Sequence, residues 1–148
     1  SLFDVTNRGT ILRLASGDDA WIARAISLTS LSGTAIKGAG SDHLLRVNGL
    51  ISGTTYGIDL GAGRGSFGNR LEIRAEGDVL GSFMAVMLRG SGAQLHNAGE
   101  MTGSAYGLGL QTGNRLGAWV LNDGVIHGGD IAILRHSALD RARVDLVN

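Results

Sequence analysis

Apolar residues along this chain recur in one short phrase, and no apolar run approaches the length of a membrane span. The phrase has Ile, Val, Leu or Met at its fifth position, and usually a Gly at its third and a second Gly at its seventh. It is clearest at 47–53, 97–103 and 122–128, with looser copies at 7–13, 27–33 and 75–81. Its first positions fall at 7, 27, 47, 75, 97, 122 and 148, in steps of 20–28 residues. A period of this length is typical of stacked repeat architectures.

Each repeat contains two further segments in which apolar and other residues alternate. One segment follows the second Gly of the phrase, as at 57–60, 85–88 and 107–110. The other comes shortly before the next copy of the phrase begins, as at 71–73 and 118–120. Alternation over so few residues indicates short strands. Three such strands per repeat, joined by Gly-rich corners, predict an all-β fold. The fold that we predict is a right-handed parallel β-helix, or β-solenoid, of about six coils of 20–28 residues.

In such a solenoid each strand lies beside its own successor, so like positions meet along the long axis. We therefore expect an inward column of Ile58, Val86, Leu108 and Ile133, each touching the next. Stacked Asn7, Asn97 and Asn122 are expected to form an amide ladder, interrupted at Ser27, Val47 and Ala75.

Some segments do not fit the repeat. Residues 14–26 are either a short helix with an acidic first turn or an irregular first coil. We expect one domain over 1–148, with 1–43 as irregular N-terminal coils or a cap, and extra length in a surface loop at 61–68 and a long corner at 136–143. Because Asn148 would open another repeat, we expect this chain to be a piece of a longer array.

Composition and charge narrow the function classes. The chain has 25 Gly, no Pro and no Cys, and 43% of its residues are apolar, which excludes a disulfide framework, a thiolate metal site and a disordered linker. Lys and Arg total 13, as do Asp and Glu, so nothing favours a nucleic-acid partner. Neither a signal peptide nor a segment for membrane insertion is present, so we expect no membrane-inserted part.

The segments 97–103, 107–110 and 118–122 resemble the degenerate repeats of large secreted bacterial β-helix proteins. These are adhesin or autotransporter passengers and the repeat regions that accompany hemolysin-type calcium-binding arrays. The resemblance covers roughly 44–148 and fits the first 43 residues poorly. It implies a secreted or cell-surface bacterial location and a non-catalytic structural or adhesion role, with a glycan or a cell surface as partner. The same coil also carries pectate-lyase-like enzymes and polysaccharide epimerases, so a carbohydrate-active protein that binds or cleaves an acidic polysaccharide is the alternative.

The outward positions of the third strand carry the candidate ligand site. The residue just before the first position of a copy of the phrase is expected to face outward, which places Arg46, Arg74 and His96 one above another. The residue two places earlier faces the same way, which places Glu72, Gln94 and Trp119 alongside. Arg donates paired hydrogen bonds to carboxylates and an indole offers a face to a sugar ring, so these residue types suit an acidic glycan. If the site is catalytic, Arg74 or His96 as base with Glu72 nearby suits lyase or epimerase chemistry. The alternative is a solvated polar face with ion pairs such as Glu72 with Arg74 or Arg46.

Two further interactions are candidates. Residues 38–44 resemble one unit of the calcium nonapeptide, with Asp42 as the ligand, but a calcium site needs adjacent copies and the Gly-rich segments at 61–64 and 90–95 lack the Asp. The alternative there is an ordinary Gly-rich corner, and we expect no cofactor besides that calcium. The open ends of a solenoid expose unpaired strand edges, so self-association through the ends is a third functional alternative.

Overall fold

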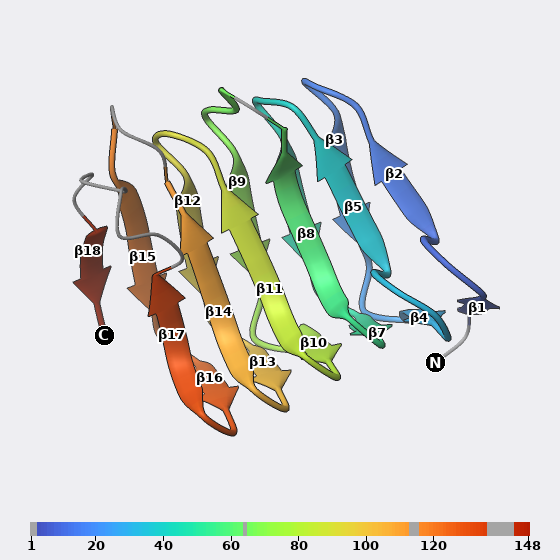
Figure 1. The fold of residues 1–148 in the computed structure, drawn as a ribbon. Coiled ribbons are helices and arrows are strands. Elements are labelled where there is room, and N and C mark those ends of the chain that lie inside the picture. The colour runs from blue at the N-terminus through green and yellow to red at the C-terminus, as the bar shows by residue number, and fades with distance from the viewer. Residues whose placement is uncertain (1–2, 64, 113–115, 136–143) are drawn as a thin grey trace.

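The chain forms an all-β solenoid in a computed structural model that describes residues 3–63, 65–112, 116–135 and 144–148. These residues form eighteen strands and no helix. The strands belong to three six-stranded parallel sheets, in which each strand pairs with the strand three places further along the chain (Figure 1). The predicted parallel β-solenoid is therefore confirmed.

The three sheets take every third strand. Sheet A contains β1 (Phe3–Asn7), β4 (Ile26–Ser30), β7 (Leu50–Gly53), β10 (Asp78–Gly81), β13 (Glu100–Gly103) and β16 (Val125–Gly128). Sheet B contains β2 (Leu12–Leu14), β5 (Ile36–Ala39), β8 (Tyr56–Ala62), β11 (Met84–Arg89), β14 (Tyr106–Gln111) and β17 (Ile131–Arg135). Sheet C contains β3 (Asp19–Ile22), β6 (Leu44–Val47), β9 (Arg70–Ile73), β12 (Gln94–Asn97), β15 (Ala118–Asn122) and β18 (Val144–Val147).

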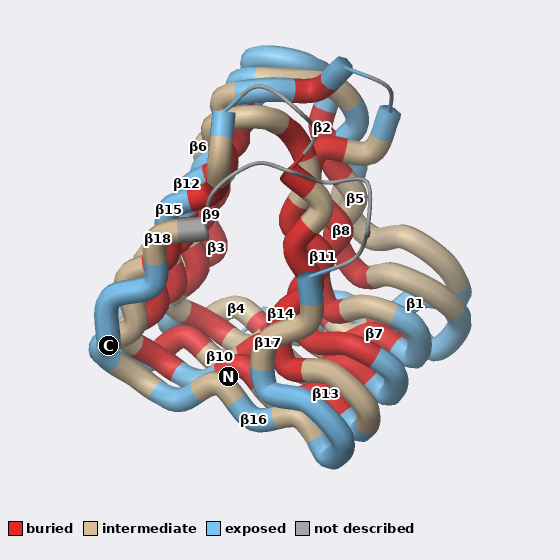
Figure 2. Tube along the Cα trace, turned by 60° about the vertical axis from the view of Figure 1, so that its left-hand side comes forward, coloured by how far each residue is buried: buried red, intermediate tan, exposed pale blue. Residues whose placement is uncertain are grey.

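The core runs along the axis as columns of matched residues. In sheet B, Ile58 lies opposite Val86, Val86 opposite Leu108, and Leu108 opposite Ile133, as the repeat predicts. Sheet A contributes a column that includes Ile51, and sheet C one that includes Leu95. Figure 2 shows the three sheets as the sides of a triangle whose interior is lined by buried residues. Each coil buries its apolar residues only against the coils on either side, so stability is a nearest-neighbour property.

Glycine sets the short corner between sheets C and A. A Cβ added at Gly99 would collide with the carbonyl oxygens of Gly77 and Arg74, and one added at Gly124 would collide with that of Gly99. Backbone therefore stacks directly on backbone at this edge, and only a residue without a side chain fits there. This explains why Gly stands at the third position in the copies at 47–53, 75–81, 97–103 and 122–128.

The first two copies of the phrase were assigned to the wrong place. Asn7 ends β1 in sheet A and pairs with Ser30, whereas Asn97 ends β12 in sheet C. Ser27 pairs with Leu50, not with Val47. The amide ladder accordingly omits Asn7: the Nδ2 of Asn97 donates to Asn122 and the Nδ2 of Asn122 to the Oδ1 of Asn148.

The structure also resolves the irregular segments. Residues 14–26 contain strand β3, not a helix: Asp18 closes a turn by a hydrogen bond to the carbonyl of Ala15, and Asp19 begins the strand. The extra length of the third repeat divides between the loop that joins β8 to β9 and a longer corner at 74–77. The predicted corner at 136–143 lies outside the described residues. The described residues contain no helix that could cross a membrane.

Candidate functional site: a groove at the corner between sheets C and A

Two outward columns on sheet C hold most of the predicted site. The first runs through Trp21, Arg46, Glu72, His96 and Leu121, and the second through Asp19, Leu44, Arg70, Gln94 and Trp119. Arg46 and His96 share a column, and so do Gln94 and Trp119, as the sequence predicts. Glu72 and Arg74 were misplaced: Glu72 stands between Arg46 and His96, and Arg74 lies beyond the end of β9.

The misplacement comes from corners of unequal length. Ile22 pairs with Val47 and Ser27 with Leu50, so four residues, 23–26, separate matched positions that only Asn48 and Gly49 separate in the next coil. The last of the four, Ile26, is already the first residue of β4. In the coil after that, residues 74–77 again occupy the corner between matched positions. The pattern of glycines aligns Gly77 with Gly99 correctly but hides the two residues inserted before it.

Long and short corners alternate along this edge of the solenoid, with the short corner at Asn48 and Gly49 between the longer ones at 23–26 and 74–77. A groove of about 770 Å³ lies on this edge and extends from Trp21 past residues 74–76 to His96 and Ala98. Its lining residues are Trp21, Arg46, Asn48, Arg74, Ala75, Glu76, His96 and Ala98. Glu72, Gln94 and Trp119, which the sequence placed in the same site, lie outside this lining.

Two arginines of the groove lining, Arg46 and Arg74, share the carboxylate of Glu72, which is not itself part of the lining. The Oε2 of Glu72 accepts hydrogen bonds from Arg46 Nε at 3.2 Å and from Arg74 Nη2 at 2.8 Å. Both arginines are partly exposed, and these bonds leave the two terminal nitrogens of Arg46 and the Nε and Nη1 of Arg74 open to a ligand. The Arg46–Glu72–Arg74 cluster carries one net positive charge and has several N–H donors that these bonds do not use, which suits the binding of a carboxylate.

Two further ion pairs border the groove. Arg24 Nε lies 2.9 Å from Glu76 Oε2, although the two residues belong to long corners two coils apart. This ion pair, called the strap from here on, spans the short corner. Because both side chains are well exposed, it contributes little to stability. On the other side, His96 Nε2 lies 2.9 Å from Asp123 Oδ2, so His96 is oriented by a carboxylate from the next coil.

Trp21 is the aromatic residue of the groove that sequence reasoning missed; Asn48, Ala75, Glu76 and Ala98 of the lining were not predicted either. The side chain of Trp21 is 68% exposed and stands one coil from Arg46 in the same outward column. An indole of this exposure offers a flat apolar face to a ligand. The sequence signal for its position is that Trp21 and Ile22 repeat the outward and inward alternation of Arg46 and Val47, with which they pair in register.

The calcium candidate stands alone. Asp42 is exposed, with φ of 58°, and its backbone N–H donates to the carbonyl of Phe67 at 2.9 Å. The described residues include no group of three His, Asp or Glu side chains placed to hold a metal ion. The geometry there is that of a Gly-rich corner in which Asp42 adopts the left-handed conformation.

One carboxyl outside the groove is perturbed. Asp78 lies on the outer face of sheet A beside Glu100, with which it is paired in register. Burial raises the pKa of Asp78 above its ordinary value of 3.8, and the nearby charge of Glu100 raises it further. Its Oδ1 is buried without a hydrogen-bond partner, so the carboxylate form is poorly solvated.

The fold and the groove define a class: a parallel β-solenoid with a ligand-sized recess on one corner. Comparison of the chain with protein-family models, curated proteins and solved structures finds no match. The functional argument therefore depends on the groove and on the surfaces of the solenoid themselves.

Proposed function

We propose that this chain is a non-catalytic structural and adhesion segment of a secreted or cell-surface bacterial protein, and that its corner groove binds an acidic glycan. The observation that carries the proposal is the placement of Trp21 beside the Arg46–Glu72–Arg74 cluster. An aromatic face next to unspent guanidinium donors suits the two chemical features of a uronic sugar, its ring and its carboxylate. The resemblance to secreted bacterial β-helix repeats supports the location.

The solenoid supports an adhesive role because it holds the groove rigidly. Trp21, Arg46, Glu72 and His96 project from consecutive strands of one sheet, and the core columns behind those strands are buried. Sites built on strands keep their geometry better than sites on loops. A ligand therefore finds the groove largely preformed and pays little to order it.

The same geometry favours binding over cleavage. A general base must be free to take a proton, yet Glu72 Oε2 already accepts hydrogen bonds from two arginines. His96, the other candidate base, has its Nε2 hydrogen-bonded to Asp123, which orients the ring and leaves Nδ1 for a proton, so His96 stays the candidate base of the lyase or epimerase alternative. We assign the groove to recognition because Glu72 is already engaged by the two arginines, and an assay for cleavage products decides between the two.

The test is a titration of the chain with short uronic-acid oligosaccharides, followed by calorimetry. We expect Trp21→Ala and Arg74→Ala each to weaken binding by about tenfold, which corresponds to about 1.4 kcal/mol. Trp119→Ala is the matched control, since it removes an equally large exposed indole from the same sheet but outside the groove, and it should leave affinity unchanged. The absence of binding by the parent chain, or an equal loss in the control, contradicts the proposal.

Two further measurements test whether the chain cleaves its ligand and where in the cell it is found. Incubation with the bound oligosaccharide should release no new reducing ends or unsaturated products, and their appearance would favour the lyase alternative. Fractionation of the bacterium that encodes the chain should place it in the medium or on the cell surface. Recovery in the cytosol alone would contradict the proposed location.

Self-association is a second candidate function, and a single comparison favours it. Leu146 and Val120 occupy the same inward column of sheet C, yet Leu146 is 53% exposed and Val120 is 0% exposed. An apolar column that opens at β18, beside unpaired strand edges, can pack against a second copy. Leu146→Glu should then lower the association constant measured by sedimentation, whereas Val147→Glu, on the outward side, should change it less. A chain that stays monomeric at high concentration contradicts this candidate.

A further inference from the structure

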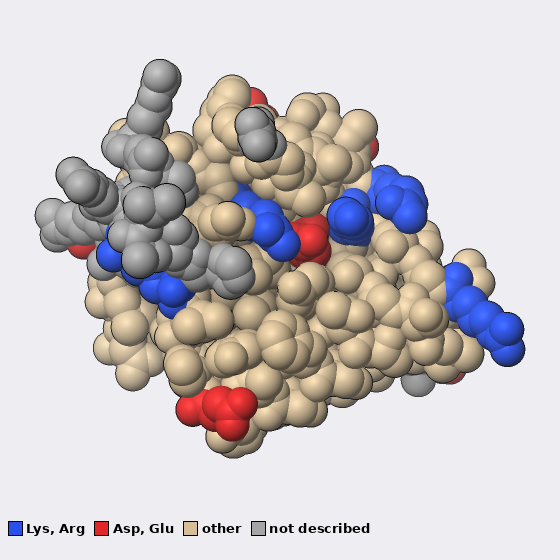
Figure 3. Space-filling view, in the orientation of Figure 1, with Lys and Arg blue, Asp and Glu red and all other residues tan. Residues whose placement is uncertain are grey.

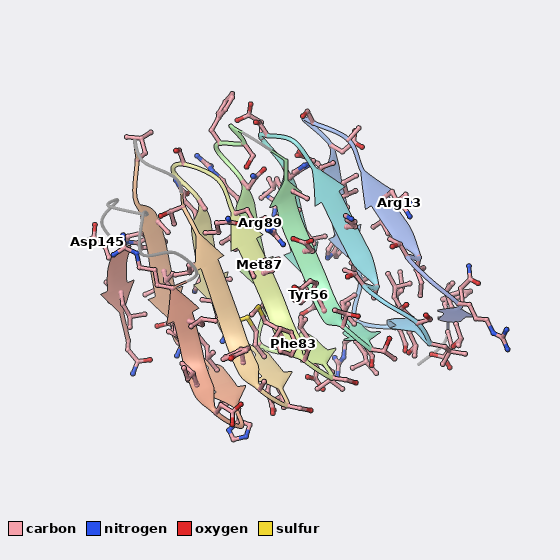
Figure 4. The ribbon with its side chains drawn as sticks, in the orientation of Figure 1. Arg13, Tyr56, Phe83, Met87, Arg89 and Asp145 are labelled. Atoms are coloured by element: carbon pink, nitrogen blue, oxygen red, sulfur yellow. The ribbon has the colours of Figure 1, made fainter. Side chains whose placement is uncertain are left out.

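A row of charged side chains crosses the outer face of sheet B, far from the groove. Arg13, Lys37 and Asp59 lie opposite one another on β2, β5 and β8. Arg89 of β11 reaches back to Asp59, so the row extends over four neighbouring strands (Figures 3 and 4). At roughly 4.8 Å between strands, it spans roughly 14 Å along the solenoid axis.

The two halves of this row differ in their balance of charge. Arg89 Nε lies 2.8 Å from Asp59 Oδ1, and Arg89 Nη1 donates to Gln111 Oε1 at 2.7 Å, so this half is neutral and hydrogen-bonded. Within the described part of the chain, neither Arg13 nor Lys37 forms an ion pair. Two like charges directly opposite each other on paired strands are destabilising. Their positive charge is thus available to an external anion.

Next to the charged row, the same face is apolar and aromatic. The ring of Phe83 lies between those of Tyr56 and Tyr106, with centroid distances of 6.2 and 5.2 Å. Phe83 is 44% exposed, and Met87 continues the column of Lys37 and Asp59 as a buried apolar residue. Figure 4 shows Met87 between Arg89 and Phe83 on this face. Phe83 precedes β11 at the corner between sheets A and B, four residues before Met87, so the rings are displaced from the charged row along the strand direction. A partner that contacts both the cations and the rings therefore crosses the face obliquely.

We propose that the outer face of sheet B is a second binding surface, which takes an acidic polysaccharide that crosses the sheet obliquely. Arg13 and Lys37 contact its carboxylates, and Phe83 contacts the apolar face of a sugar ring. The contact of Phe83 with a sugar ring distinguishes this partner from a polymer recognised by charge alone, because an acidic peptide or a polyphosphate has no pyranose ring. The choice of polymer class rests on the proposed function, but the surface is separate from the groove.

The positions of the two sites give the proposal a consequence. The groove lies at the corner between sheets C and A, and sheet B is the opposite side of the triangle (Figure 2). A single segment of polysaccharide cannot contact both sites at once. One molecule can therefore hold two chains and link them, which adds avidity without new contacts.

The experiment is a titration of the ¹⁵N-labelled chain with a defined uronic-acid oligosaccharide at low salt. We expect two separate groups of shifting amides, one around Trp21 and Arg46 and one on β2, β5 and β11. Arg13→Gln combined with Lys37→Gln should abolish the second group and leave the first. Arg8→Gln, an exposed arginine outside the row, is the matched control and should leave both. The double variant should melt at or above the temperature of the parent chain, because like-charge repulsion is removed.

The outcomes separate the two proposals. Shifts around the groove alone, or shifts on sheet B that persist in the double variant, overturn the second surface and leave the proposed function intact. Shifts on sheet B alone contradict the groove assignment and support the second surface. Poly-glutamate tests whether charge alone is recognised, because it carries carboxylates but no sugar ring. If it binds sheet B as tightly as the oligosaccharide does, the assignment to a sugar is overturned. Phe83→Leu should weaken the oligosaccharide and leave any poly-glutamate binding unchanged.

Discussion

The Nδ2 of Asn97 donates a 2.8 Å hydrogen bond to Asn122 Oδ1, and these two residues occupy the same inward position of sheet C in consecutive coils. In earlier coils this position is held by Ile22, Val47 and Ile73. The column thus changes from apolar to amide at Asn97, which is fully buried and whose Oδ1 has no partner.

Substitutions at Asn97 should reveal this boundary. Asn97→Asp places a carboxylate where the existing oxygen already lacks a donor, and the lost Nδ2 also bonded the carbonyl of Val125. We expect it to cost about 3 kcal/mol or more at neutral pH. Asn97→Val, which copies the apolar residues of the column, should cost only about 1–2 kcal/mol. Denaturant unfolding measures both, and a smaller cost for Asp than for Val would contradict the ladder.

Deletion of core methyl groups should depend on position along the stack. Ile58 is 0% exposed and has matched apolar neighbours on both sides, so Ile58→Ala should cost about 2–5 kcal/mol. Ile133 lies in the same column but in the last coil, where it is only partly buried. Ile133→Ala should therefore cost clearly less. Equal losses in the free energy of unfolding would show that the coils do not stabilise one another as nearest neighbours.

The raised pKa of Asp78 gives a pH dependence of known sign. Above the raised pKa the carboxyl is charged in both the folded and the unfolded chain, and the penalty for burying that charge is fully present. As pH falls through the raised pKa toward 3.8, the folded state binds the proton first and this penalty disappears.

Asp78→Asn should therefore raise the melting temperature at pH 7 and flatten its dependence on pH above 4. Glu100→Gln removes only the second cause of the shift, so it should raise the melting temperature by a smaller amount. Thermal unfolding between pH 4 and 8 provides the measurement. A parent chain that gains stability from Asp78 as pH rises would show that the carboxylate has a stabilising partner.

The strap over the groove should affect binding more than stability. Glu76 is the one acidic residue in the groove lining, and its bond to Arg24 is exposed to solvent. Glu76→Gln should change the free energy of unfolding by less than about 1 kcal/mol. The same variant should strengthen the binding of a uronic oligosaccharide, because it removes a repelling charge. Calorimetry with Glu100→Gln as a control outside the groove tests this, and weaker binding would mean that Glu76 contacts the ligand favourably.

What the sequence determined by itself was the periodic part of the molecule. The Gly at the third position and the alternating strand segments predicted three strands per coil, the parallel stacking and the column of Ile58, Val86, Leu108 and Ile133. Local pattern sufficed there because each coil repeats the same contacts with its neighbours. It also grouped Arg46 with His96, since every residue along a strand keeps a fixed face.

Only the tertiary structure decided where the repeat slips. The corners at 23–26 and 74–77 are each two residues longer than the corner at Asn48 and Gly49, and a corner has no hydrophobic period by which its length can be read. Those insertions moved Arg74 off the strand, placed Glu72 between Arg46 and His96, and brought Trp21 to the groove in place of Trp119. Register between coils is set by backbone pairing across 20–28 residues, so it depends on contacts that no local stretch of sequence contains.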